Sequence, residues 1–201
     1  MSRARTLTRS FYARQDPVAV AKDLLGKIIR IPGGRCAARI VETEAYGGSR
    51  DRASHAWRGK TPRNEPMFGD PGTAYIYLCY GLHRMFNVVT APHGVAAAVL
   101  IRGVEPVEGH GEMARRRKYP LGDFRIGGGP GALSQALGIR MHWNGCDLVS
   151  GPIRIEDDGM RLRNTQVRRG RRVGVNYAGP AARFLWRFSI RDNPWVSRAK
   201  A

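Results

Sequence analysis

Two glutamates at the end of an apolar run are the residues of this sequence best suited to acid–base chemistry. They lie at positions 42 and 44 in Arg39-Ile-Val-Glu-Thr-Glu-Ala-Tyr46. Residues two apart in a β-strand point to the same face, so Glu42 and Glu44 would share one environment. Neighbouring carboxyl groups push each other's pKa values apart, which can leave one ionised as a general base. The alternative is a pair of structural salt bridges to nearby arginines, and composition alone favours that alternative.

Three tyrosines within six residues form the second group, in the segment from Pro71 to Asn87. Tyr75 and Tyr77 would share one face of a strand, and Tyr80 falls at the turn that follows. Tyrosines at alternating positions commonly pack within a sheet. An enzyme that acts on a nucleobase, however, must stack the flipped base on aromatic side chains and fill the gap that it leaves. Both interpretations stay open at this point.

The charge of the chain favours a polyanionic partner. Its 34 lysines and arginines against 16 aspartates and glutamates give a net charge of +18 over 201 residues. Phosphate contacts with release of counterions would supply much of the affinity for a nucleic acid. No basic amphipathic helix or lipidation motif points to a membrane instead. The dense runs Arg115–Lys118 and Arg168–Arg172 are either DNA contacts or solvated surface.

The elements that would position these residues can be read from periodicity and turn signals. We predict helices from Asp16 to near Gly26, within 107–118, and from 127 to 136, and strands at 27–31, 37–41, 74–80, 85–90, 95–104, 173–177 and 184–190. A turn at Pro32-Gly33-Gly34 would join the first two strands as a hairpin, whereas residues 46–72 form a long loop of the kind that is often functional. Strands without regular βαβ alternation indicate a mixed α/β (α+β) domain with a largely antiparallel sheet. We expect a basic N-terminal extension over 1–15 and one domain over 16–201.

Cellular context follows from what the sequence lacks. No apolar run approaches the roughly 20 residues of a membrane-spanning helix, and the N-terminus lacks the apolar core of a signal peptide. The three scattered cysteines, Cys36, Cys79 and Cys146, suit a reducing compartment. We therefore expect a cytoplasmic protein, or a nuclear one in a eukaryote.

Several ordered segments resemble the alkyladenine, or 3-methyladenine, DNA glycosylase family. The matching segments are Arg39-Ile-Val-Glu-Thr-Glu-Ala-Tyr46, Thr61-Pro-Arg-Asn64, Pro71-Gly-Thr73, Tyr77-Leu-Cys-Tyr80-Gly81, Gly129-Pro-Gly-Ala-Leu-Ser-Gln-Ala-Leu137, Arg171-Arg-Val-Gly-Val-Asn-Tyr-Ala-Gly179 and Asn193-Pro-Trp-Val-Ser197. The resemblance covers nearly the whole chain. It implies a single domain with a curved antiparallel sheet flanked by helices and a protruding β-hairpin, and no metal or organic cofactor.

The resemblance also implies a role for each candidate residue. Glu44 would deprotonate the attacking water, Arg102 would help to hold that water, and Glu42 would be structural support. Four residues would bind the flipped purine, namely Tyr46 and Tyr77 on its two faces, His55 through its imidazole or backbone N–H, and Asn87 in the pocket wall. Tyr80 would intercalate through the minor groove. We further expect Arg63, Arg84 and Arg169 to contact the DNA backbone.

The implied reaction is hydrolysis of the N-glycosidic bond of a damaged purine in double-stranded DNA, without a lyase step. Candidate substrates are 3-methyladenine, 7-methylguanine, hypoxanthine and ethenoadenine. Two departures from the family pattern leave the lesion range open: Ala132 stands where the family often has a lysine, and His83-Arg84 follows the expected wedge. His83 either reaches the groove or is a solvent-exposed turn residue.

Three rival functions remain at this point. A noncatalytic damage-binding protein would need the same aromatic cage, although Glu44 and Arg102 argue against it. A metal-dependent hydrolase is disfavoured because the five histidines form no local metal-binding spacing. A bifunctional glycosylase/lyase is disfavoured because Lys60 and Lys118 lie in polar or basic segments rather than in an apolar pocket. One domain with one site needs no partner copy, so we expect a monomer.

Overall fold

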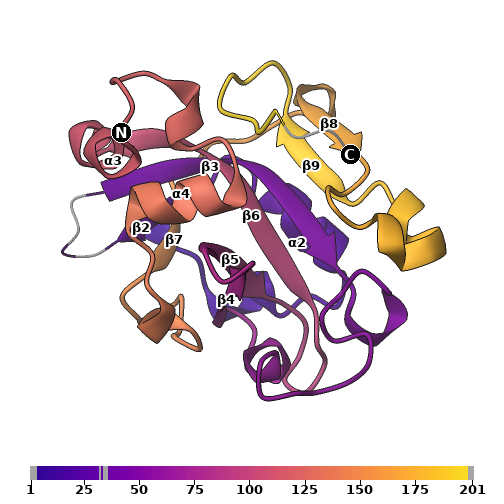
Figure 1. The fold of residues 1–201 in the computed structure, drawn as a ribbon. Coiled ribbons are helices and arrows are strands. Elements are labelled where there is room, and N and C mark those ends of the chain that lie inside the picture. The colour runs from indigo at the N-terminus through magenta and orange to yellow at the C-terminus, as the bar shows by residue number, and fades with distance from the viewer. Residues whose placement is uncertain (1–3, 32, 34–35, 199–201) are drawn as a thin grey trace.

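The computed structural model describes residues 4–31, 33 and 36–198. In that part of the chain nine strands form one open sheet, and every pair of neighbouring strands is antiparallel (Figure 1). The strands are β1 (Arg5–Thr6), β2 (Ile28–Ile31), β3 (Cys36–Tyr46), β4 (Ala74–Cys79), β5 (His83–Val89), β6 (Ala98–Glu108), β7 (Arg154–Asp157), β8 (Val167–Gly170) and β9 (Arg187–Ile190). Their order is β1-β7-β2-β3-β6-β5-β4, with β9 and then β8 added beside β3. This confirms the predicted α+β fold class.

Within the described ranges, four short α-helices accompany the sheet. They are α1 (Arg9–Tyr12), α2 (Pro17–Asp23), α3 (His110–Arg117) and α4 (Pro130–Leu137). The start of α2 is as predicted, because the Asp16 carboxylate accepts a hydrogen bond from the Val18 N–H at 2.8 Å and Pro17 occupies the first turn. The turn after α2 reaches Gly26, whose φ of +83° favours glycine.

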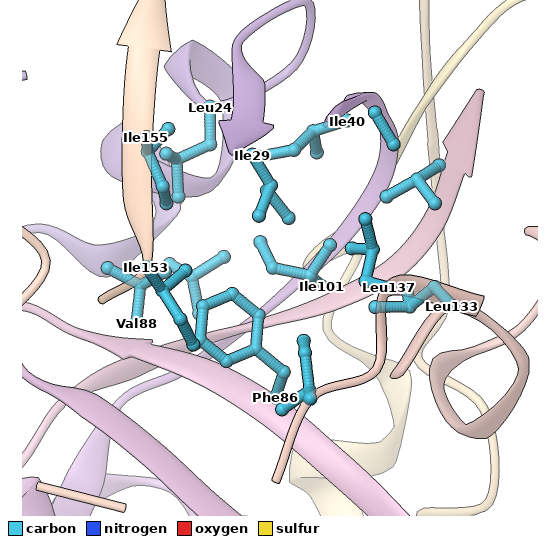
Figure 2. Close-up of a cluster of buried hydrophobic side chains, with 14 of the residues drawn as sticks. Leu24, Ile29, Ile40, Phe86, Val88, Ile101, Leu133, Leu137, Ile153 and Ile155 are labelled. Atoms are coloured by element: carbon cyan, nitrogen blue, oxygen red, sulfur yellow. The ribbon is translucent and has the colours of Figure 1, made fainter. Parts of the chain in front are cut away.

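One hydrophobic core joins the helices to the sheet. Leu24, which follows α2, and Leu133 and Leu137 of α4 pack with strand residues such as Ile101 and Phe86 (Figure 2). These side chains are at most 1% exposed. Complete burial of such a side chain contributes about 1.5–3 kcal/mol, so the core fixes the strands that carry the site.

The strand β3 is the centre of the sheet and carries both glutamates. Its first half pairs with β2 and its second half with β9 along one edge, while β6 runs along the other. The register between β3 and β6 passes from Ile40↔Val104 to Glu42↔Gly103 and then to Thr43↔Ile101. Val41 and Arg102 are therefore extra residues in two successive bulges. Bulges re-aim side chains, and here Arg102 comes to lie beside both glutamates.

The structure corrects two strand predictions in the C-terminal part of the chain. Residues 173–177 are not a strand but a turn that leads into the 3₁₀ segment Asn176–Arg183. The predicted strand 184–190 is shorter, since β9 begins at Arg187. The described part of the expected N-terminal extension packs on the domain, because β1 pairs with β7 and Tyr12 is fully buried.

The two predicted hairpins are observed. The β2–β3 pairing is confirmed, whereas Pro32 and Gly34 of its predicted turn lie outside the described residues. The β4–β5 hairpin is joined by the tight turn 80–82. The predicted strand 95–104 begins only at Ala98 and continues to Glu108.

Candidate active site

A cavity of about 570 Å³ lies where β4, β5 and β6 meet the loops 46–67 and 173–177. Seven of the residues selected from the sequence line it, namely Tyr46, His55, Arg63, Tyr77, Tyr80, Asn87 and Arg102. Apolar side chains such as Met67 and Leu100 complete the wall. The fold thus gathers residues that are up to 56 positions apart in the sequence, from Tyr46 to Arg102, around one hollow.

Glu44 is fully buried directly behind the wall of this cavity. One carboxylate oxygen accepts from the Val173 N–H at 2.7 Å, and the other accepts from the Tyr46 hydroxyl at 2.9 Å and from Arg102 at 3.4 Å. All three donors belong to residues that line the cavity. Burial raises the pKa of Glu44 above its ordinary value, although Arg102 and the other donors oppose the rise.

Glu42 is equally buried but is enclosed by its partners. One oxygen accepts from Arg187 at 2.6 Å, from the Ser197 hydroxyl at 3.0 Å and from Arg102 at 3.2 Å. The other accepts from the Ser197 N–H at 2.8 Å. This confirms that Glu42 and Glu44 share one face of a strand, with Arg102 between them.

Aromatic rings form much of the cavity wall. The rings of Tyr75 and Tyr77 lie 5.4 Å apart, and the His55 ring meets Tyr77 edge-on at 4.5 Å. His55 Nδ1 is 2.9 Å from the Tyr75 hydroxyl. Partial burial, and then the charge of Arg63, lower the pKa of His55 below its ordinary value, so that the neutral imidazole is favoured. Burial raises the pKa of Tyr75 to about 12.

The remaining wall is held by backbone contacts. Asn87 is 4% exposed and donates to the Tyr75 carbonyl at 3.0 Å and the Met85 carbonyl at 3.2 Å. Its amide is therefore fixed in orientation at the floor of the cavity. Burial and the adjacent Glu44 raise the pKa of Tyr46 well above its ordinary value, which keeps its hydroxyl a donor.

Tyr80 stands at the tip of the β4–β5 hairpin with 92% of its surface exposed. Its φ of +51° and the φ of +69° at Gly81 are the pattern of a type I′ turn, closed by the Leu82 N–H on the Cys79 carbonyl at 3.1 Å. A tyrosine in this left-handed conformation costs roughly 1–3 kcal/mol, and such strain clusters at functional positions. The hairpin thus presents an aromatic side chain at the mouth of the cavity.

The three arginines expected at the DNA backbone are not brought together. Arg63 lies at the cavity, with its guanidinium 5.6 Å from the centre of the Tyr77 ring. Arg84 borders a separate hollow beside the end of α4, and Arg169 lies over Phe188 in a depression next to α2. His83, which is exposed, packs beside Gly131 at the start of α4.

Two features of the site were missed in the sequence. Arg172, at the end of a basic run that we expected either to contact DNA or to be solvated, is fully buried and forms an ion pair with Asp51 at 2.5 Å. Val173, which we placed in a strand, instead turns its N–H toward Glu44. Neither contact can be predicted from the neighbouring sequence. Arg172 and Asp51 are 121 residues apart, and Val173 and Glu44 are 129 residues apart.

The described residues contain neither a metal-binding cluster nor a membrane-spanning helix. They contain no group of three or more histidine, cysteine, aspartate or glutamate side chains placed to hold a metal ion. None of the helices within the described ranges is long and apolar enough to cross a bilayer.

The comparisons with known proteins agree with one another. A family model described as methylpurine-DNA glycosylase matches residues 10–194. Curated relatives named "Putative 3-methyladenine DNA glycosylase" include one from Clostridium perfringens, 43% identical over 96% of this chain and 98% of the relative. Others come from Anaeromyxobacter dehalogenans, at 50% identity over 96% and 86%, and Methanocella arvoryzae, at 45% over 96% of both chains. The chain therefore belongs to the methylpurine-DNA glycosylase family.

Proposed function

We propose that this protein is a monofunctional DNA glycosylase of base excision repair. It would turn an alkylated or deaminated purine out of double-stranded DNA, hydrolyse its N-glycosidic bond and leave an abasic site. The candidate bases are 3-methyladenine, 7-methylguanine, hypoxanthine and ethenoadenine. The observation that carries the proposal is the buried Glu44 carboxylate, hydrogen-bonded to the wall of an aromatic cavity.

The cavity is suited to bind a flipped purine. Tyr46 and Tyr77 would stack on its faces, His55 would contact its edge, and Asn87 would close the floor. Alkylated purines such as 7-methylguanine carry positive charge, and each contact of a cation with an electron-rich ring contributes about 0.5–2 kcal/mol. A neutral purine such as hypoxanthine lacks this attraction and would depend on hydrogen bonds, which the neutral His55 in the cavity wall would supply.

Hydrolysis would proceed by direct attack of water on the sugar. Glu44 would take a proton from the water as its oxygen bonds to C1′, with Arg102 holding the same water, and the purine would leave with the electrons of the broken glycosidic bond. The raised pKa makes Glu44 a better proton acceptor than an exposed glutamate. A neutral purine must also gain a proton as it leaves, whereas a cationic one need not.

The exposed hairpin tip and the basic surface would contact the DNA duplex. Tyr80 would fill the gap left by the flipped nucleotide, as base-flipping enzymes require. Arg63 at the cavity, together with Arg84 and Arg169 on other surfaces, would contact phosphates.

A lyase step is disfavoured by the surroundings of the two lysines considered for it. Lys60 is exposed and pairs with Glu65 at 3.0 Å, and Lys118 is exposed after α3. An amine that forms a Schiff base needs an environment that lowers its pKa, such as an apolar pocket. Borohydride trapping on damaged DNA tests this directly, because a covalent adduct would contradict the proposal.

The decisive experiment compares the wild type with Glu44→Gln for release of hypoxanthine and 3-methyladenine from duplex DNA. We expect release by the wild type and a loss of roughly 10²- to 10⁴-fold in the variant, the usual contribution of a general base. Binding of damaged duplex is measured in parallel and should persist in both. Glu108→Gln, at the far end of β6, is the matched control and should leave release unchanged. Binding without release by the wild type would instead support the noncatalytic damage-binding function.

A further inference from the structure

A buried ion pair lies on the side of Tyr46 that faces away from the cavity. The Asp51 carboxylate receives two hydrogen bonds from the Arg172 guanidinium, at 2.5 and 2.8 Å, and neither side chain is exposed. The same guanidinium donates to the backbone carbonyls of Ala45 at 2.8 Å and Ala181 at 3.1 Å. Two carboxylate oxygens and two carbonyls thus fix both the position and the plane of Arg172.

The guanidinium fixed in this way lies over two aromatic rings. Its central carbon lies 4.8 Å from the centre of the Tyr46 ring and 5.1 Å from that of Trp186. Tyr46 lines the cavity, whereas Arg172 does not. Arg172 therefore supports the face of Tyr46 opposite to the one that a bound base would contact.

The hydroxyl of the supported ring is one of the three donors to Glu44. The Tyr46 hydroxyl thus donates a hydrogen bond to the Glu44 carboxylate, and one face of the Tyr46 ring contacts Arg172. We propose that Arg172, held by Asp51, is a positioning residue that sets the plane of Tyr46 and so maintains the hydrogen bond from its hydroxyl to Glu44. This inference rests on the proposed function and adds a residue outside the cavity to it.

A planar guanidinium suits this task better than an ammonium. Arginine can bind a carboxylate through two parallel bonds while it stacks on a ring, whereas lysine offers a point charge on a flexible stem. Arg172→Lys keeps the charge that Asp51 needs but removes the flat support. Tyr46 then loses its fixed orientation, and misplacement of a catalytic group by about 1 Å can cost up to roughly 100-fold in rate.

The test is a double-mutant cycle with Arg172→Lys, Tyr46→Phe and the double variant. Single-turnover release of hypoxanthine is measured across pH, together with binding to a duplex that carries a stable abasic analogue. Tyr46→Phe retains the ring and removes only the hydroxyl. Arg39→Lys is the matched control, because Arg39 also forms a two-point pair with an aspartate, Asp158, and contacts the Gly26 carbonyl, yet lies away from the cavity.

We expect Arg172→Lys to slow release by roughly 10- to 100-fold, with binding of the abasic analogue retained. When Tyr46→Phe is added to Arg172→Lys, the release rate should fall little further, because the hydrogen bond that Tyr46→Phe removes is already weakened. Arg39→Lys should lower the melting temperature and leave release unchanged.

The pH profile distinguishes positioning from general stability. The charged or titratable groups around Glu44 include Glu42 and Tyr46 on β3, Arg102 on β6, Tyr77 on β4, Arg187 on β9, which binds Glu42, and Arg172 behind Tyr46. Only the Tyr46 contact is weakened in both single variants. Loss of a donor to a carboxylate raises its pKa, so both variants should move the acid limb of the rate profile to higher pH.

Several outcomes would overturn the inference. If folded Arg172→Lys keeps the wild-type rate and acid limb, or if its loss multiplies with that of Tyr46→Phe, Arg172 does not act through Tyr46. If Arg172→Lys fails to fold, Asp51→Asn is the second variant, and a wild-type acid limb in Asp51→Asn would equally overturn it. Absence of release by the wild type would overturn the proposed function itself, and this inference with it.

Discussion

Glu42 and Glu44 lie two residues apart on one face of β3, share Arg102, and are both fully buried, yet their surroundings differ. Glu42 has hydrogen bonds from two arginines and from both donors of Ser197, and none of its neighbours except Arg102 reaches the cavity. Among the described residues, the three donors to the Glu44 carboxylate all line the cavity. Charge and burial alone thus do not separate the two carboxylates, whereas the position of their partners marks Glu44 as the one that we propose to react.

The largest effect on stability is expected at Glu42. Glu42→Gln would leave Arg102 and Arg187 without a carboxylate that they share, and removal of one partner from a buried ion pair costs about 3–5 kcal/mol. Denaturant unfolding measures this loss. Glu156→Gln is the control, since Glu156 pairs with the partly exposed Arg30 and should cost no more than about 1 kcal/mol. Equal losses in the two variants would show that the network around Glu42 is not special.

Arg102, which contacts both glutamates, should give an intermediate effect. Arg102→Lys replaces the planar guanidinium with a single ammonium group, which cannot bind Glu42 and Glu44 in the same way. Loss of one hydrogen bond to a charged group costs about 1.5–3 kcal/mol. We expect the activation free energy of base release to rise by this amount, which single-turnover kinetics would measure. Arg187→Lys is the comparison, because Arg187 binds Glu42 and should affect unfolding more than release. A reversed pattern would contradict the separation between the two carboxylates.

The smallest effect concerns the pH dependence of stability. The pKa of Glu44 is raised in the folded protein, so its contribution to stability is complete below the ordinary value of 4.5 and is lost as pH rises through the folded value. Base release requires the ionised form and should rise over the same pH window. Glu44→Gln should remove this part of the pH dependence, which unfolding measured from pH 4 upward would detect. Parallel stability curves for the two proteins would show that Glu44 does not titrate in this window.

The parts of the fold predicted from the sequence are those with strong local patterns. Apolar runs located the central strands, and alternation placed Glu42 with Glu44 and Tyr75 with Tyr77. The resemblance to a family selected the residues that gather around the cavity. Their roles in binding and catalysis stay predictions.

The parts that were missed depend on contacts between distant segments. The strands β7, Arg-Ile-Glu-Asp between β1 and β2, and β8, Val-Arg-Arg-Gly beside β9, are charged and show no apolar alternation, so only their pairing partners reveal them. The apolar spacing of residues 173–177 is typical of a strand, yet Gly174 has a φ of +73° and the segment turns toward Glu44. The burial of Arg172 likewise depends on Asp51, far away in the sequence.

The paired bulges at Val41 and Arg102 also constrain how this chain can change in length. Between Ile40 and Thr43 each strand carries one extra residue, and the two extras together restore at Thr43 the register that holds at Ile40. A single deletion in either strand would shift the pairing by one position and turn the residues beyond it to the opposite face of the sheet. Insertions and deletions should therefore be tolerated in exposed loops such as 120–123 but not between Ile40 and Tyr46 or between Leu100 and Val104, where segment length is as restricted as residue type.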